Sequence, residues 1–426
     1  MRGRIIRLTV ALAAGFAIML AQLTNLGFVS ADGLRSHELN TRAAAAAIGN
    51  PRGAIISADG EVLALPIDHD DTGQRRLREY PHGPLYAHVV GYLGAAAGAS
   101  GIERSYDSEL SGAATGIAVQ ELADLFADSS RVGDVVLTLH HGVQLTARAA
   151  LGDRDGAVVV IDTATGALIA MWSRPSFDPE ALVSPAPGAV QAGARLPVAR
   201  AYQRHYAIAA DESLGRAGVE LLTGARREPG PTGVDLPGEP DGTELDGTDI
   251  GSGDEAPVRL TPLQLAAAAA AVANDGIRLR PHVVGRVDGR STDGELATPD
   301  ASVETRPRDA GRLFDAASTP GLLARMAAAA QQASIRLEPA DGVQVTAAVA
   351  NGPLADPSEA GTHTGSWAVL LTPADAPTVA VAVLIEPDST LDIGNGPRSD
   401  TLATMIAATA AEATLALRAV PDSDRP

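Results

Sequence analysis

The chain has 426 residues, enough for two or three domains of ~150 residues each and for a sizeable hydrophobic core. Its 52 acidic and 33 basic residues give a formal net charge of −19, and so acidic a surface is expected to repel nucleic acid and anionic lipid. Every basic residue is arginine, so the sequence contains no lysine, and it also contains no cysteine. These absences exclude a lysine base, a lysine Schiff base, disulfides, thiol nucleophiles and thiolate metal sites.

The amino terminus carries the pattern of a membrane anchor. No charge occurs from Leu8 to Ala31, and a helix of ~24 residues measures ~36 Å, longer than a hydrocarbon core of ~30 Å. Three arginines precede this stretch, so the positive-inside rule predicts a cytoplasmic amino terminus and residues 32–426 outside the membrane. The alternative is a signal peptide cleaved after Val29-Ser30-Ala31, but the apolar stretch is longer than an ordinary signal core. We therefore expect an uncleaved anchor that crosses the membrane once.

The elements that follow alternate between strand and helix signals. The predicted order is a helical stalk at 33–48, a hairpin at 54–65 that turns at Asp59-Gly60, a helix at 118–127, and a hairpin with strands 157–162 and 167–172. After a solvated loop at 225–257 come a helix from Thr261-Pro262 to Asp275-Gly276, a helix from Ser318 to about Ala333, strands at 343–350, 367–372 and 378–385, and a final helix at about 398–418. This order favours an α+β fold with an antiparallel sheet flanked by helices.

Eight short strings stand in one order along nearly the whole chain. They are Ala31-Asp32-Gly33-Leu34-Arg35, Asn50-Pro51-Arg52-Gly53 with its Asp59-Gly60 turn, Tyr80-Pro81-His82-Gly83, Gly101-Ile102-Glu103-Arg104-Ser105-Tyr106, Gly156 to Met171, Ser176-Phe177-Asp178-Pro179, Leu260-Thr261-Pro262-Leu263-Gln264 and Asn274-Asp275-Gly276. Together they resemble the class B penicillin-binding proteins, most closely the short actinobacterial penicillin-binding protein A type. The resemblance implies a membrane anchor, a small pedestal domain and a penicillin-recognising transpeptidase domain outside the membrane.

The predicted domains combine this resemblance with the patterns above. They are a cytoplasmic tip and transmembrane anchor at 1–31, a stalk and dimerisation-like pedestal at 32–150, a degenerate transpeptidase-like domain at 151–420 and a tail at 421–426.

The catalytic motifs that the resemblance implies are missing. Transpeptidases of this family acylate a serine in Ser-x-x-Lys, helped by Ser-x-Asn and Lys-Thr-Gly, and the lysine is needed because a serine hydroxyl is a weak nucleophile until a neutral base takes its proton. Ser213-Leu214-Gly215-Arg216 has the first spacing, but a guanidinium with a pKa above ~12 is no base at neutral pH. We interpret it as a polar turn of a helix between Ala207 and Gly224.

A deletion explains the missing motifs. The residues from Arg200 to Tyr206 resemble the lead-in to the family's catalytic serine, whereas Ala207 to Leu222 resemble a helix that lies well downstream of it. The stretch that carries both serine motifs is therefore predicted to be deleted, which leaves the transpeptidase domain short of its helical lobe.

The third motif has two candidate positions. His363-Thr364-Gly365-Ser366 would place histidine where the family has lysine, but too few residues precede Trp367 for the chain to reverse, so His363 is predicted to lie in a loop. Strand 343–350 is the better match, and there the motif falls on Ala348-Val349-Ala350, whose side chains cannot bind a carboxylate.

Other polar clusters are interpreted as structural. His140-His141 are expected on opposite faces of a strand rather than at one metal ion. Asp68-His69-Asp70-Asp71 lacks the spacing of a calcium loop and is predicted to be a solvated turn. Glu103-Arg104 is expected to be a structural pair. The sequence thus nominates no catalytic, cofactor-binding or metal-binding residue.

The overall hypothesis is a catalytically inactive penicillin-binding-protein-like membrane protein that acts as a scaffold or regulator. Its expected partners are the membrane, through residues 8–31, wall-synthesis or division proteins such as a multi-pass glycosyltransferase, and peptidoglycan, with no nucleic acid and no cofactor. The rival hypothesis is a D,D-transpeptidase or carboxypeptidase that uses an unrecognised serine and a histidine base such as His205 or His363.

Overall fold

A computed structural model describes most of the chain after residue 50. The described ranges are 51–67, 77–94, 97–113, 131–183, 196–208, 231–239, 258–291, 302–335, 346–353, 365–386 and 399–419, with Arg7, Gly15, Phe16, Met19, Gln22, Ala217, Gly218, 220–222 and Leu337. The predicted stalk at 33–48, the predicted helix at 118–127, Asp68 to Asp71, Ser213 to Arg216 and His363 lie outside these residues.

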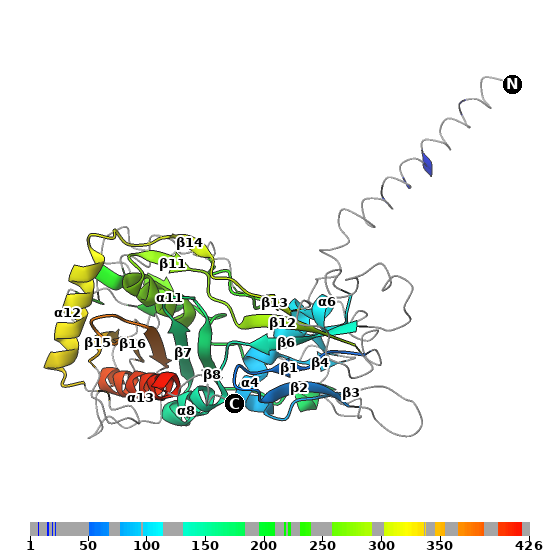
Figure 1. Cartoon of the computed structure of the whole chain (residues 1–426), viewed down its shortest axis with the longest axis horizontal. Coiled ribbons are helices and arrows are strands. Elements are labelled where there is room, and N and C mark those ends of the chain that lie inside the picture. The colour runs from blue at the N-terminus through cyan, green and yellow to red at the C-terminus, as the bar shows by residue number, and fades with distance from the viewer. Residues whose placement is uncertain are drawn as a thin grey trace.

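Two sheets organise the described chain (Figure 1). The first has six strands in the order β13-β12-β6-β1-β2-β3, with bounds Ser302–Glu304, Val284–Ser291, Arg131–Leu137, Ile55–Ile56, Val62–Ile67 and Leu77–Glu79. Its pairs are antiparallel except for β1 and β6, which are parallel. The hairpin predicted at 54–65 is confirmed as β1 and β2. Because β12 and β13 come from residues 284–304, this sheet takes strands from both sides of the boundary expected at residue 150.

The second sheet has five antiparallel strands in the order β15-β16-β17-β7-β8. Their bounds are Ala348–Pro353, Ser366–Thr372, Val379–Ile385, Gly156–Asp162 and Leu168–Arg174. Every residue of β16 and β17 is buried, as expected for strands that are covered on both faces. The predicted antiparallel sheet and its hairpin of β7 and β8 are confirmed.

Helices cover the two faces of the five-stranded sheet. Helix α11 (Pro262–Ala273) packs on β17 and β7, and α13 (Ser399–Ala419) packs on β16 and β17 and against α8 (His141–Leu151); α11 and α13 lie on opposite sides of the sheet in Figure 1. The other helices of the described chain are α4 (Gly83–Val90), α5 (Gly101–Ser105), α6 (Asp107–Leu110), α9 (Glu180–Val183) and α12 (Thr319–Gln332). Its other strands form three separate pairs, which are β4 (Leu93–Gly94) with β5 (Gly98–Ala99), β9 (Tyr206–Ile208) with β10 (Val258–Leu260), and β11 (Ile277–Leu279) with β14 (Asp309–Arg312).

The ends of α11 lie where its sequence predicts them. Thr261 and Gln264 form a capping box, in which each side chain accepts a hydrogen bond from the other residue's backbone N–H. The chain leaves the helix through Gly276, whose φ of 83° is in the left-handed region. A Cβ at Gly276 would lie 2.0 Å from the carbonyl oxygen of Phe314, so this turn requires glycine.

Two expectations about local structure are wrong. His140 and His141 do not lie on a strand: β6 ends at Leu137, and His141 is the first residue of α8. The reason is tertiary, because the Asp59 carboxylate accepts the backbone N–H of His141 at 2.9 and 3.0 Å and so stabilises the start of that helix. The helix expected from Ala207 is also displaced, since Tyr206–Ile208 form strand β9, and helical residues are seen at 217–222 where that segment is described.

One helix in the described part of the chain, at Thr401–Ala419 within α13, is long and apolar enough to cross a membrane. It packs on β16, β17 and α8, and Ala403, Ala407 and Ala410 are fully buried. We therefore assign it to the protein core.

Candidate functional site

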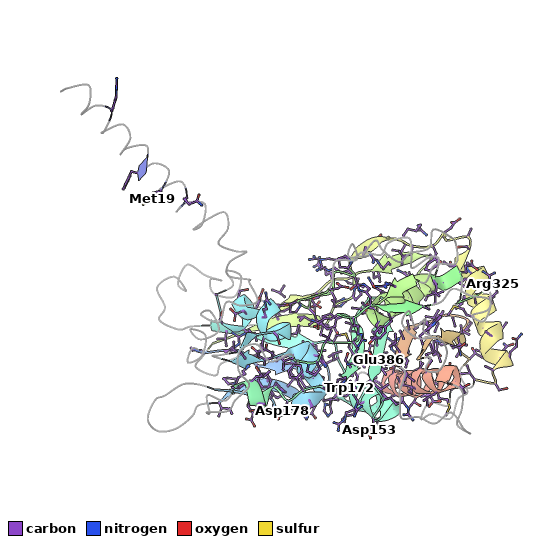
Figure 2. All side chains as sticks on the ribbon, turned by 180° about the vertical axis from the view of Figure 1, so that it is seen from behind. Met19, Asp153, Trp172, Asp178, Arg325 and Glu386 are labelled. Carbon is purple, nitrogen blue, oxygen red and sulfur yellow. The ribbon has the colours of Figure 1, made fainter. Side chains whose placement is uncertain are left out.

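The segment that resembles the lead-in to a catalytic serine is anchored to the end of the five-stranded sheet. Glu386, labelled in Figure 2, follows β17 directly. Its carboxylate accepts hydrogen bonds from Arg200 Nε at 2.6 Å, Arg200 Nη2 at 2.9 Å and the Tyr206 hydroxyl at 2.6 Å. Arg204 adds an ion pair at 2.9 Å. Bidentate pairing of this kind fixes both position and orientation, so residues 200–206 are held rigidly on the sheet.

The charges in this anchor keep Glu386 ionised. Burial acts to raise the pKa of Glu386, but the hydrogen bonds from Arg200 and Tyr206 outweigh it, and the pKa lies below its usual value. Burial and the hydrogen bond to Glu386 also raise the pKa of the Tyr206 hydroxyl. Neither group can therefore take a proton from an alcohol near neutral pH, and the anchor is structural.

His205, the described candidate for a histidine base, has a suitable charge state but no nucleophile bonded to it. Burial lowers the pKa of His205, the charge of Glu239 acts to raise it, and the charge of Arg259 acts to lower it. The net shift is downward, so the ring is neutral at pH 7. It forms no hydrogen bond with the residues that the structure describes. The Ser173 hydroxyl of β8 accepts a hydrogen bond from the backbone N–H of Ala201.

The predicted position of the Lys-Thr-Gly motif falls on β15, the edge strand next to β16. Asn351 donates a hydrogen bond to Thr404 of α13 at 2.9 Å. Because side chains alternate along a strand, Ala348 and Ala350 point to the opposite face of the sheet. Both are buried, so this face of β15 carries methyl groups at the position predicted for the motif.

The same face of the sheet is filled by an indole. Trp367 lies opposite Gly352 in the register of β15 and β16 and is fully buried. Its Nε1 has no hydrogen-bond partner in the described part of the chain. This face of the sheet is therefore apolar around Ala348, Ala350 and Trp367.

Helix α12 packs beside β15. Its buried stripe of Leu322, Met326 and Ala330 packs toward β15 and α11, and Figure 1 shows the helix standing just beyond β15. The Arg325 guanidinium, labelled in Figure 2, forms an ion pair with Glu220, whose neighbours Leu221 and Leu222 are fully buried. Glu220 therefore joins its segment to α12.

The Glu103 carboxylate is the centre of a buried ion cluster, whose arginines are distant in sequence from the expected neighbour Arg104. Its oxygens accept hydrogen bonds from Arg52 Nε at 2.8 Å and from Arg78 Nε at 2.5 Å. Arg52 also forms an ion pair with Asp107 at 2.6 Å. These bonds join the start of the six-stranded sheet, β3 and α5. Arg52 and Glu103 both lie in strings that carry the family resemblance. They are 51 residues apart, so the sequence alone does not indicate that they are in contact.

No metal centre is present among the residues that the structure describes, since no group of three or more histidine and acidic side chains there could hold an ion.

The anchor at Glu386 is also a feature that sequence reasoning missed, because Arg200 and Glu386 are 186 residues apart.

Comparison with known proteins shows which protein family the chain resembles in sequence and structure. Residues 52–136 match the family model "Penicillin binding protein A dimerisation domain", and residues 228–407 match "Penicillin binding protein transpeptidase domain". The chain is 29% identical to the peptidoglycan D,D-transpeptidase PbpA of Mycolicibacterium smegmatis, with 89% of this chain and 93% of that protein covered. The crystal structure of PBPA from Mycobacterium tuberculosis matches with a TM-score of 0.65 at 24% identity, covering 86% of this chain and all of the other. Its penicillin G acyl-enzyme complex matches with a TM-score of 0.66 at 24% identity, over the same shares of both chains.

The alignment with the M. smegmatis protein also contains positions that have no counterpart in this chain. It runs over 476 positions and includes 89% of the 426 residues, so roughly 100 positions have no counterpart here. The chain keeps both family domains while it lacks about this much sequence, and it belongs to the class B penicillin-binding proteins, in the group of penicillin-binding protein A.

Proposed function

We propose that this chain is a catalytically inactive penicillin-binding protein with a scaffold or regulatory role in peptidoglycan synthesis, in elongation or division. The observation that carries the proposal is the apolar face of β15, where Ala348 and Ala350 are buried at the expected position of the Lys-Thr-Gly motif. The complete absence of lysine removes the base that this family uses.

Retention of the scaffold supports a role other than catalysis. The buried ion cluster around Glu103 and the anchor at Glu386 each keep their carboxylate paired with two arginines, and an unpaired charge in either place would be strongly destabilising. A fold that keeps these networks while it lacks the acylation groups is suited to binding. The expected partners are wall-synthesis or division proteins, such as a multi-pass glycosyltransferase, and peptidoglycan itself.

We further propose that residues 8–31 anchor the chain in the cell membrane, with the amino terminus in the cytoplasm and residues 32–426 outside. In support, Phe16 and Met19 are helical and 70% and 63% exposed, and Figure 2 shows Met19 away from the packed body. Exposed apolar side chains on a helix are suited to contact with lipid. Protease added to intact cells should digest a carboxy-terminal tag but not an amino-terminal one; the opposite result would refute this orientation.

Labelling with a fluorescent penicillin tests the loss of catalysis. The full-length chain is incubated with the label, denatured and separated by electrophoresis, beside the M. tuberculosis protein whose structure contains a penicillin G acyl-enzyme. We expect a band for the control and none for this chain. A covalent band would refute the proposal, and its abolition by His205→Gln would favour the rival serine and histidine mechanism.

A further inference from the structure

A cavity of about 570 Å³ opens where the six-stranded sheet meets the rest of the fold. It lies between the β12–β13 hairpin, the α5–α6 segment, and the segments around Arg280 and Arg308. The position is separate from β15 and α12, and nothing in the proposed function uses it. Its size is within the range of ~300–1,000 Å³ that is usual for ligand-binding pockets.

The wall formed by the hairpin is apolar. Val287 and Val303 are cross-strand partners in β12 and β13, so their side chains share one face of the hairpin. Val303 is 60% exposed. Beside them His282 is only 8% exposed, lines the cavity, and makes no ring hydrogen bond with the residues described here. The cavity therefore offers an aliphatic wall with an imidazole beside it.

Three exposed arginines line the opening of the cavity: Arg280, Arg306 and Arg308. Arg280 donates Nε–H to the carbonyl of Gly233, whereas Arg306 and Arg308 form no side-chain hydrogen bond or ion pair with the described chain. On a protein with a net charge of −19, unpaired arginines that converge on one cavity are suited to bind carboxylates.

Two of the acidic side chains that line the cavity, Asp235 and Glu109, accept hydrogen bonds from neighbouring protein groups. Asp235 accepts the backbone N–H groups of Val283 at 2.7 Å and Val284 at 2.9 Å and the Tyr106 hydroxyl at 3.1 Å. Glu109 accepts the Ser108 hydroxyl, and Glu304 lies opposite Arg286 across the hairpin, where the Arg286 guanidinium pairs with Asp288. No ion pair joins Arg306 or Arg308 to an acidic side chain of the described chain, so their positive charge is left for a ligand.

Strand β13 also has an open edge. Within the described ranges it pairs with β12 on one side only. An unpaired edge presents main-chain N–H and C=O groups at the spacing of an extended polypeptide. This edge adjoins the cavity at Val303, Glu304 and Thr305.

We propose that the β13 edge and this cavity bind an extended segment of a partner protein that alternates acidic and aliphatic residues. The segment pairs with β13, its aliphatic side chains pack on Val287 and Val303, and its carboxylates bind Arg306 and Arg308. The inference goes beyond the proposed function and does not depend on it, because penicillin labelling reports on a different region.

Fluorescence anisotropy with a labelled peptide that alternates glutamate with valine and leucine tests the proposal on the full-length chain. The double variant Arg306→Gln/Arg308→Gln should bind at least ten times more weakly, and Val303→Ser about three times more weakly. The matched control is Arg148→Gln, an exposed arginine of α8 that does not line the cavity, and it should bind as the unaltered chain does. All these side chains are exposed, and thermal unfolding verifies that each variant is folded.

Three outcomes would overturn the proposal. The first is no saturable binding of the peptide below ~1 mM. The second is an equal loss of affinity in Arg148→Gln, which would indicate attraction by overall charge. The third is unchanged affinity in Val303→Ser together with full displacement of the peptide by inorganic phosphate, which would assign the cavity to a small anion instead of a polypeptide.

Discussion

Replacement of Glu103 by glutamine tests how far the buried ion cluster stabilises the six-stranded sheet. Glu103 is 0% exposed and bonds to two arginines that are themselves 4% or less exposed. Glutamine keeps the shape of the side chain but removes its charge, so the guanidinium groups of Arg52 and Arg78 stay buried with less compensation. Removing one partner of a buried ion pair costs ~3–5 kcal/mol, and we expect a loss of this size in the free energy of unfolding.

Asp107→Asn provides a matched comparison within the same cluster. Asp107 pairs with the same Arg52 at 2.6 Å, but its side chain is 49% exposed. Solvent weakens exposed pairs to ~0–1 kcal/mol, so this variant should be nearly neutral. Both variants are compared by urea unfolding of the full-length chain followed by circular dichroism, with hydrogen exchange locating the loss to β1, β3 and α5. Equal destabilisation by the two substitutions would refute the reasoning.

The same cluster predicts a dependence on pH. Burial acts to raise the pKa of Glu103, but Arg78 and then Arg52 outweigh burial, so the folded pKa is below its usual value. A carboxylate with a lowered folded pKa stabilises the fold above its unfolded pKa of ~4.3, and this contribution is lost as the pH falls through the folded value. The urea midpoint should therefore decrease below about pH 4, with a smaller decrease in Glu103→Gln. An identical acid profile for both chains would contradict this assignment.

Three further substitutions test the site and the packing. Ala348→Lys, which introduces lysine at the position predicted for the Lys-Thr-Gly motif, should bury an unpaired ammonium, lower the unfolding temperature by several degrees and yield no penicillin label; a penicillin-labelled product would contradict this expectation. Gly53→Ala should destabilise the β1–β6 contact by more than ~2 kcal/mol, because its Cβ would lie 2.0 Å from the carbonyl oxygen of Gly133, and an unchanged urea midpoint would disprove that close approach. Glu386→Gln should loosen the segment around Arg200 and increase its hydrogen exchange, whereas unaltered exchange there would mean that the anchor does not hold the segment.

Local patterns were sufficient for the elements whose stabilising residues are near in sequence. The capping box of Thr261 and Gln264 and the left-handed turn at Gly276 delimit α11 from within about 16 residues, and the alternation around Asp59-Gly60 predicts the first hairpin. Because helix caps and tight turns depend on neighbouring residues, their physics is present in the sequence itself.

Contacts between distant segments were decided only by the tertiary structure. The pairing of β12 with β6, the bond between Arg200 and Glu386, and the start of α8 at His141 all depend on groups that lie 80 or more residues away. No periodicity records such partners, because they are set by which surfaces become buried together.

The absence of a lysine base is a property of the sequence alone, since no fold can supply a side chain that the chain lacks. What lies on the face of β15 opposite Asn351, by contrast, required three dimensions: the alternation of β15, the contact between Asn351 and Thr404, and the position of α12 together place methyl groups and an indole on that face. Composition thus limits which chemistry is available, whereas packing decides what occupies the space where that chemistry would occur.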